Sequence, residues 1–259
     1  MRNRLLKSFA LFALLATVFV SCSKDDDENS NVNSDSNVVD LGLPSGVKWA
    51  TCNLGAANPW NYGNYYAWGE TQTKDDYSWE TYKHCNGSAE TLTKYCYDAE
   101  YGNNGFTDNL TTLESADDAA TAVLGSDYSM PTADDWSELS SQCYWVWTLN
   151  YNNQGVSGYI VYKAKSAGDK GEKVYAEGTP SASYSLKNAH IFLPVAGFRI
   201  NKNINSDGSI GRYWSASLSE GNPGDTRYCS FYGRKVYPTS DYNRYCGLSV
   251  RPVLHKSSN

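Results

Sequence analysis

Apolar and polar positions alternate along several short stretches of this chain, a pattern typical of strands that bury one face. Residues 47–52 show the alternation clearly, and residues 64–68 repeat it. Two further stretches, 144–149 and 158–163, flank the turn-forming sequence at 152–155 and predict a β-hairpin. Similar patterns predict strands at 189–194, 213–218, 227–232 and 248–254.

Two segments carry helix signals instead. Residues 115–124 have acids in their first turns and are followed by Gly125, a frequent helix stop. Residues 131–139 predict a second helix, with Thr132 as N-cap and Asp135 as its return partner. Many short strands and two short helices indicate an α+β fold. Residues 166–185 are rich in Gly, Ser, Lys and Glu without a period, and we expect an inserted loop there.

The first 21 residues have the composition of an export signal. A basic start, Arg2 to Lys7, is followed by an uncharged run over 8–20, which is shorter than the roughly 20 residues of a membrane span. Val20-Ser21-Cys22 resembles the lipobox of bacterial lipoproteins, in which the cysteine sulfur receives a lipid before cleavage. We therefore expect Cys22 to be lipidated and to begin the mature chain; the alternative is an ordinary secreted protein that is cut elsewhere.

An acidic run, Asp-Asp-Asp-Glu at 25–28, follows the expected lipid. It resembles the signal by which lipoproteins of Bacteroidota reach the outer face of the outer membrane, whereas the alternative is a solvated spacer. Residues 22–38 are thus expected to form a lipidated acidic and polar tether, and residues 39–259 a single domain. The expected location is the outer membrane, lipid-anchored and facing the cell exterior.

Charge and composition narrow the choice of partners. Cleavage before Cys22 removes three basic residues and no acid, which takes the formal net charge from −6 to −9. A net acidic chain without a basic stripe is a poor candidate for nucleic acid, so the expected membrane attachment is through the lipid alone. Aromatic residues make up 14% of the chain, including 21 tyrosines, and favour twisted strands.

The cysteine count fits an oxidising compartment. Besides Cys22 the chain has Cys52, Cys85, Cys96, Cys143, Cys229 and Cys246. An even number in an exported chain predicts disulfides, although six cysteines allow fifteen connectivities. The expected pairs are Cys85–Cys96 across a short loop, Cys229–Cys246 between neighbouring strands, and Cys52–Cys143 as the remainder. A metal site is the alternative, but no Cys-x-x-Cys or histidine spacing supports it.

Seven ordered motifs resemble the Fibrobacter succinogenes major paralogous domain (FISUMP). They are VDLGLPSGVKWATCN at 39–53, YGNYYAWGET at 62–71, DDAA at 117–120, MPT at 130–132 followed by Trp136, FLPVAGFR at 192–199, YWSAS at 213–217 and SVRPV at 249–253. The resemblance covers 39–254 and implies a C-type lectin-like fold, with twisted antiparallel sheets, two short helices and long loops. It implies a surface location but no activity, and the inserted loop departs from the family's more compact pattern.

Two functions from different classes are compatible with these features. The first is a binding, adhesion or structural module for a glycan or a host or cell-surface protein, since tyrosine and tryptophan offer flat faces to sugar rings. The motif tryptophans Trp49, Trp68, Trp136 and Trp214 are expected in the core. The candidate ligand contacts are therefore aromatic residues in turn-like surroundings: Trp60, Tyr62, Tyr101, Tyr184, Tyr237 and Tyr242.

The alternative is an enzyme distantly related to the formylglycine-generating, sulfatase-modifying enzymes, which use a close pair of cysteines. Cys229 and Cys246 are too far apart in sequence to copy that pair, and no common catalytic motif is present, so no catalytic residue is assigned. The histidines His84, His190 and His255 lie far apart in the sequence, and each is interpreted as a surface or packed residue and not as a catalyst. The doubled acids at 75–76, 117–118 and 134–135 could be acid–base pairs or calcium ligands, but 117–118 and 134–135 lie at predicted helix starts, where carboxylates cap backbone amides. No cofactor is expected, and a calcium site at these acids is left open.

Overall fold

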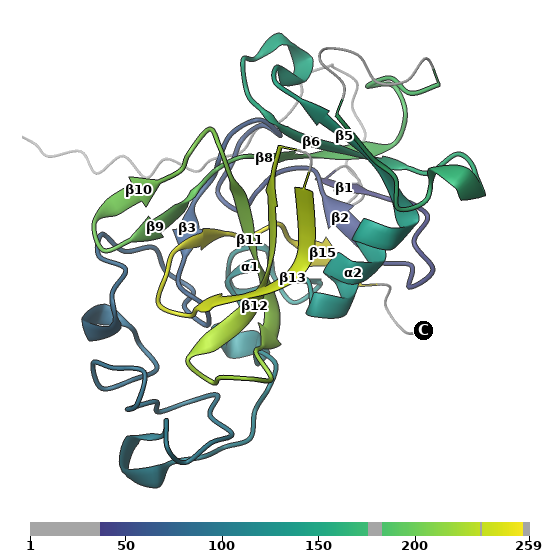
Figure 1. The fold of residues 1–259 in the computed structure, drawn as a ribbon. Helices are drawn as coiled ribbons and strands as arrows, with labels where there is room; N and C mark the ends of the chain where they lie inside the picture. Colours follow the sequence, from purple (N-terminus) through teal and green to yellow (C-terminus); the bar gives the residue numbers. More distant parts are fainter. Residues whose placement is uncertain (1–36, 176–182, 234, 256–259) are drawn as a thin grey trace, which may run out of the picture. The chain divides into compact units, whose positions relative to one another are not determined.

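Residues 37–175, 183–233 and 235–255 are described by the computed structural model of this protein. They form a mixed α+β fold with two α-helices, in which antiparallel strand pairs predominate (Figure 1). The predicted signal peptide, Cys22 and nearly all of the tether lie outside these residues. Within the described ranges, no helix has the length and apolarity that crossing a membrane requires.

The largest sheet has five strands. Their order is β13 (Lys235–Asn243), β12 (Asp225–Tyr232), β11 (Gly211–Leu218), β14 (Leu248–Ser249) and β3 (Tyr65–Tyr66). All neighbours in it are antiparallel except β11 and β14, which pair through Tyr213 and Ser249.

A second sheet has four strands. Their order is β7 (Lys173–Tyr175), β5 (Cys143–Thr148), β6 (Gly158–Lys163) and β8 (His190–Pro194). The predicted hairpin is confirmed, because β5 and β6 pair antiparallel from Cys143 with Lys163 to Thr148 with Gly158. The 3₁₀-helix η5 (Tyr151–Asn153) lies in its connection.

Both ends of the described chain meet in a third sheet. Its order is β1 (Val38–Val39), β2 (Lys48–Ala50), β15 (Val253–Leu254) and β4 (Tyr128–Ser129). Since β2 pairs with both β1 and β15, the first and last strands flank the same partner. The remaining two strands, β9 (Phe198–Ile200) and β10 (Asn203–Asn205), pair antiparallel as a separate hairpin.

The two α-helices begin with the predicted caps. The side chain of Asp118 accepts the backbone N–H groups of Ala120 and Thr121 at the start of α1 (Ala119–Leu124). Thr132 and Asp135 form the predicted capping box of α2 (Ala133–Gln142). Residues 115–117, predicted as the first turn of a longer helix, form a separate 3₁₀-helix, η4 (Ser115–Asp117), because Asp118 has an extended backbone.

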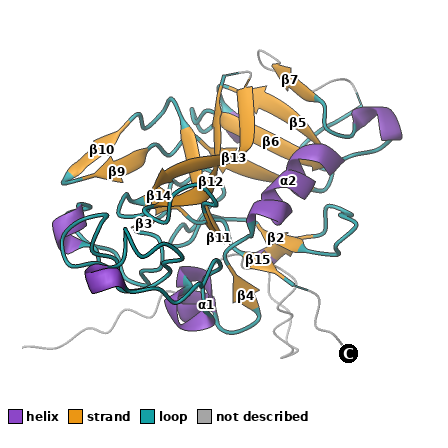
Figure 2. Ribbon diagram, turned by 60° about the horizontal axis from the view of Figure 1, so that its bottom comes forward, coloured by secondary structure: helices purple, strands orange, loops and turns teal. Residues whose placement is uncertain are grey.

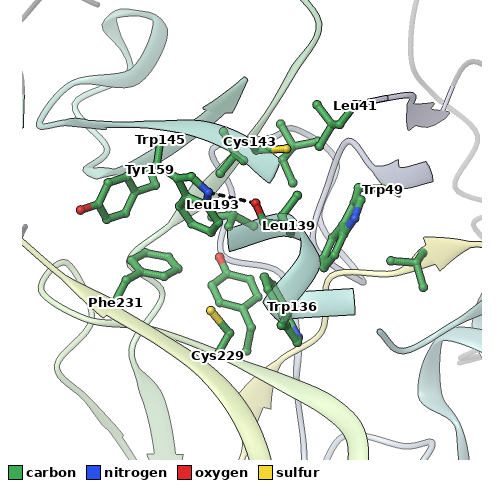
Figure 3. Packing of buried hydrophobic residues seen from close by; sticks show 14 of the residues in the cluster. Leu41, Trp49, Trp136, Leu139, Cys143, Trp145, Tyr159, Leu193, Cys229 and Phe231 are labelled. Carbon is green, nitrogen blue, oxygen red and sulfur yellow. Dashed lines mark hydrogen bonds between the residues drawn. The ribbon is translucent and has the colours of Figure 1, made fainter. Parts of the chain in front are cut away.

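Alternation along the strands divides the buried side chains among distinct clusters. On β5, Trp145 points into a first core and its neighbour Val146 into a third core, as period-2 geometry requires. On β12, Cys229 faces the first core and Tyr228 a second core. The first core therefore lies between the two large sheets, and Figure 3 shows Trp136 and Leu139 of α2 packed in it.

The members of each core come from distant parts of the sequence. The first core contains Leu41, Leu43, Val47, Trp49, Trp136, Leu139, Cys143, Trp145, Trp147, Tyr159, Val161, Ile191, Leu193, Val195, Tyr213, Cys229, Phe231 and Val253. The second contains Leu54, Tyr66, Trp68, Tyr95, Ala119, Ala120, Met130, Phe198, Trp214, Ala216, Leu218, Tyr228, Cys246, Leu248 and Val250. The third contains Tyr144, Val146, Tyr151, Ile160, Tyr162, Tyr184 and Phe192. The four motif tryptophans are fully buried, which confirms their predicted place in the core.

Three local predictions need correction. The strand predicted at 248–254 is two strands, β14 and β15, separated by Val250-Arg251-Pro252. The nine-residue strand β13 was missed because Pro238 and polar residues interrupt its pattern, which an edge strand tolerates. The loop predicted at 166–185 contains the 3₁₀-helix η6 (Ala167–Asp169) and β7, which pairs with β5.

A long segment poor in strands connects β3 with β4 and contains the 3₁₀-helices η2 (Trp79–Thr81) and η3 (Asn103–Gly105) (Figure 2). Buried charges hold it. The carboxylate of Asp117 accepts hydrogen bonds from Lys83, Lys94 and Tyr95. The guanidinium of Arg244, itself fully buried, donates to the hydroxyl of Tyr82 and to the backbone carbonyls of Lys94, Tyr95 and Pro223.

Candidate functional site

A cavity of about 280 Å³ is lined by residues of β3, of β9 and of the loop before η2. Strands β3, β9 and β10 lie at the left of Figure 1. We call this cavity the tyrosine–arginine pocket. Its lining residues are Gly63, Asn64, Tyr65, Thr73, Lys74, Asp75, Tyr77 and Arg199. The lining combines aromatic rings with amide, hydroxyl, carboxylate and guanidinium groups, a composition suited to a polar organic ligand.

Backbone hydrogen bonds join the three segments that line the pocket. Tyr77 and Asn201 exchange N–H···O bonds, both of 2.8 Å, and so attach the loop before η2 to the β9–β10 turn. Arg199 and Gly247 likewise exchange bonds of 2.7 and 3.0 Å. Position 247 requires glycine, because a Cβ atom there would lie 2.6 Å from the buried ring of Tyr77. The pocket is therefore part of the folded framework.

The two pocket tyrosines act as fixed walls. The hydroxyl of Tyr77 donates to the backbone oxygen of Tyr65 at 2.6 Å, and the hydroxyl of Tyr65 donates to the backbone oxygen of Ala196. Burial raises the pKa of Tyr65 to about 12 and also raises that of Tyr77, so both phenols stay protonated at neutral pH. Both side chains are buried and their hydroxyls bond to the backbone, so these residues fix the shape of the pocket and leave contact with a ligand to its exposed residues.

Arg199 is the cation in the pocket without an acidic partner. Its guanidinium carbon lies 5.8 Å from the ring centroid of Tyr65 and 5.9 Å from that of Tyr77. Its Nε atom is buried without a hydrogen-bond partner, and among the described residues no carboxylate forms an ion pair with it. Lys74, by contrast, donates to Glu70 at 2.8 Å and to the backbone oxygen of Thr81 at 3.0 Å.

The rim supplies further polar groups. Asn64, Thr73 and Asp75 are exposed at the mouth of the pocket. Tyr62, one of the predicted ligand contacts, directly precedes the lining residue Gly63 and is half-buried. Burial and the nearby carboxylate of Asp207 raise the pKa of Tyr62. The exposed residues of the lining therefore supply both donors and acceptors.

The other predicted aromatic contacts do not gather there. Tyr184 is buried and stacks on Tyr144 with ring centroids 4.5 Å apart, so its expected exposure is wrong. Tyr237 is exposed and stacks on Tyr232 at the tip of the β12–β13 hairpin. The remaining three are half-buried: Trp60, Tyr101 and Tyr242.

The three expected disulfides are absent from the described residues, where all six cysteines are free thiols. Cys229 faces the first core and Cys246 the second, so the strand that carries Cys229 separates the pair. Cys85 pairs with Leu92 across its loop, and its thiol contacts the backbone oxygen of Trp79 at 3.2 Å. The remaining expected pair is also unbridged: Cys52 is partly exposed and Cys143 is buried in the first core.

Several titratable groups noted in the sequence have structural partners, whereas one carboxylate oxygen of Asp76 is buried without a hydrogen-bond partner. Asp118 and Asp135 are caps, as predicted. His84 is buried and contacts the backbone oxygen of Gly69 at 2.8 Å, and His190 contacts the hydroxyl of Tyr151 at 2.9 Å. Across the residues that the structure describes, no group of three or more His, Cys, Asp or Glu side chains could hold a metal ion.

Sequence reasoning missed most of the pocket. Tyr65 belongs to a predicted strand and Arg199 to a quoted motif, but nothing local indicated that they meet. Tyr77 lies in a stretch without periodicity. A charged residue directly after the apolar run at 191–198 was the available signal for Arg199.

No protein-family model, no curated protein and no solved structure matches this chain.

Proposed function

We propose that this chain is a lipid-anchored surface protein of the FISUMP family with a C-type lectin-like fold, and that it binds a glycan in the tyrosine–arginine pocket. The seven ordered motifs support the family and the fold. The lipobox and the acidic run support attachment through Cys22 to the outer membrane, with the domain facing the cell exterior.

The observation that carries the binding role is the pocket lining. Sugar rings present C–H faces that pack on aromatic side chains and hydroxyl groups that need hydrogen-bonding partners. Asn64, Thr73 and Asp75, all exposed, and the partly buried Arg199 supply donors and acceptors for the hydroxyls, while the buried Tyr65 and Tyr77 fix the lining in place. A cavity of about 280 Å³ lies just below the range of ligand sites, roughly 300–1,000 Å³, and suits one sugar unit of a longer chain.

The enzyme alternative has less support. It needs an activated pair of thiols, whereas Cys229 and Cys246 lie in different cores. Burial raises the pKa of Cys246 to about 12 and raises that of Cys229, which disfavours the reactive thiolate at neutral pH.

A glycan array with the purified full-length protein, run with and without calcium, tests the binding role. We expect binding to a subset of glycans, and at least a tenfold loss of affinity for them in Asp75→Asn, which removes an exposed carboxylate from the rim. Asp127→Asn is the matched control, because Asp127 is equally an exposed loop aspartate but lies outside the pocket lining. Absence of binding to every glycan, or equal losses in both variants, would contradict the proposal.

Location is tested separately from binding. Cys22→Ser should abolish labelling by a clickable fatty acid, because only a thiol forms the lipid thioether. Label that persists in the variant would exclude the proposed anchor. Protease treatment of intact cells should remove the protein from the surface, and complete protection would exclude the exterior location.

A further inference from the structure

We infer that the tyrosine–arginine pocket selects an acidic sugar, and that Arg199 binds the carboxylate of a uronic acid unit. The inference rests on the proposed glycan-binding function and names the chemical class of its ligand.

The charges in the pocket favour an anionic ligand. The charge of Lys74 is compensated by Glu70 at 2.8 Å, and both side chains are largely shielded from solvent. The carboxylate of Asp75 is exposed, so solvent and salt screen it. Arg199 is half-buried between two aromatic rings and has no acidic partner within the described residues. Among the charged lining residues, Arg199 therefore combines partial burial with the lack of an opposite charge paired with it in the described residues.

The hydrogen bonding of Arg199 also favours an anionic ligand. Its Nε atom is buried and unpartnered, and a buried donor without an acceptor is unfavourable. No hydrogen bond joins its two terminal nitrogens to a described residue, and neither nitrogen is a buried unpartnered atom. A planar guanidinium presents paired donors that match the two oxygens of a carboxylate.

The rest of the lining fits the sugar ring that would carry this carboxylate. With Arg199 on the acid group, the exposed lining residues Asn64, Thr73 and Asp75 offer donors and acceptors for the hydroxyls of the ring. A carboxylate on a polyhydroxylated ring meets both requirements.

The decisive experiment changes the ligand. Binding of the full-length protein is measured by calorimetry for oligogalacturonate, oligoglucuronate and alginate fragments, each alongside its carboxyl-reduced, neutral counterpart. We expect at least one acidic series to bind at least tenfold more tightly than its reduced form. Arg199→Gln should remove this preference, and Arg199→Lys, which keeps the charge without the paired donors, should retain part of it. Melting temperatures identify any variant that fails to fold, and the reduced ligands test the idea without a substitution.

The outcomes separate this inference from the proposed function. Glycan binding without preference for the acidic form, or a preference that survives in Arg199→Gln, overturns the uronate assignment and leaves glycan binding intact. No binding to any glycan overturns the proposed function itself. A glutamate-rich peptide that displaces the oligouronate at equal concentration also overturns the inference, because carboxylates alone, without a sugar ring, would then suffice.

Discussion

Replacement of Arg244 by methionine tests how the long segment between β3 and β4 is held in place. Arg244 is fully buried, and four hydrogen bonds of 2.8–3.0 Å join its guanidinium to Tyr82, Lys94, Tyr95 and Pro223. Its guanidinium carbon also lies 5.1 Å from the ring centroid of Trp68. Methionine occupies part of the same volume but donates no hydrogen bond.

The expected loss of stability follows from the hydrogen-bond acceptors that Arg244→Met leaves without a donor. Three backbone carbonyls lose their donor, and each buried acceptor left unsatisfied costs about 1–3 kcal/mol. Removing the guanidinium also removes its own desolvation penalty of several kcal/mol, which offsets part of that cost. We expect a net loss of about 3–5 kcal/mol in the free energy of unfolding, comparable with breaking a buried charged pair.

Urea unfolding measures the loss, and hydrogen exchange locates it. Arg227→Met is the matched control, because Arg227 lies in β12, is partly exposed and pairs with Asp241 at 3.4 Å. A surface pair of this kind contributes roughly 0–1 kcal/mol. Exchange should accelerate over residues 82–96 in Arg244→Met alone. If both variants lose less than about 1 kcal/mol, the view that Arg244 holds this segment is refuted.

Three further predictions concern pH, thiols and the segment at 166–185. Burial lowers the pKa values of His84 and His190 in the folded state, so the unfolded chain binds more protons below about pH 6.5 and stability should fall as the pH drops through that value. Urea unfolding at pH 7.5 and 5.5 checks this, and a double His→Gln variant should show a smaller difference; an equal difference would contradict the assignment. In the native protein, iodoacetamide should modify the partly exposed Cys52 and Cys85 before the four buried cysteines, as peptide mass spectrometry can establish, whereas disulfide-linked peptides would restore the original expectation. Tyr184→Ala should lower the free energy of unfolding by about 3 kcal/mol, the lower end for emptying a buried aromatic site, because Tyr184 packs in the third core; an unchanged melting temperature would show that it does not.

Local patterns in the sequence were sufficient to predict those structural features that depend on residues close together along the chain. The caps at Asp118 and Thr132 depend on backbone groups two or three residues away, and both were predictable. The β5–β6 hairpin follows from two alternating runs around a turn. The burial of Trp49 and Trp214 followed from the resemblance of their motifs, and the structure agrees.

The tertiary structure decided the features that depend on how the strands are arranged in the fold. These include the core that each strand face contacts and the position of a strand in its sheet. Cys229 and Cys246 are 17 positions apart and look like partners, yet period-2 alternation on β12 directs Cys229 away from the core that contains Cys246. Strand β13 was equally unpredictable, because an exposed edge strand accepts Pro238 and polar residues that would exclude it from the middle of a sheet.

The tyrosine–arginine pocket belongs wholly to this second category. Tyr65, Tyr77 and Arg199 are separated by up to 134 positions, and they meet because β3 pairs with β14 while Tyr77 and Arg199 bond to the β9–β10 turn and to Gly247. The sequence alone indicated the α+β class and the helix caps at Asp118 and Thr132, since these follow from patterns of nearby residues. The pocket arises from long-range pairing of strands, and the lack of an acidic partner for Arg199 among the described residues depends on that same long-range arrangement.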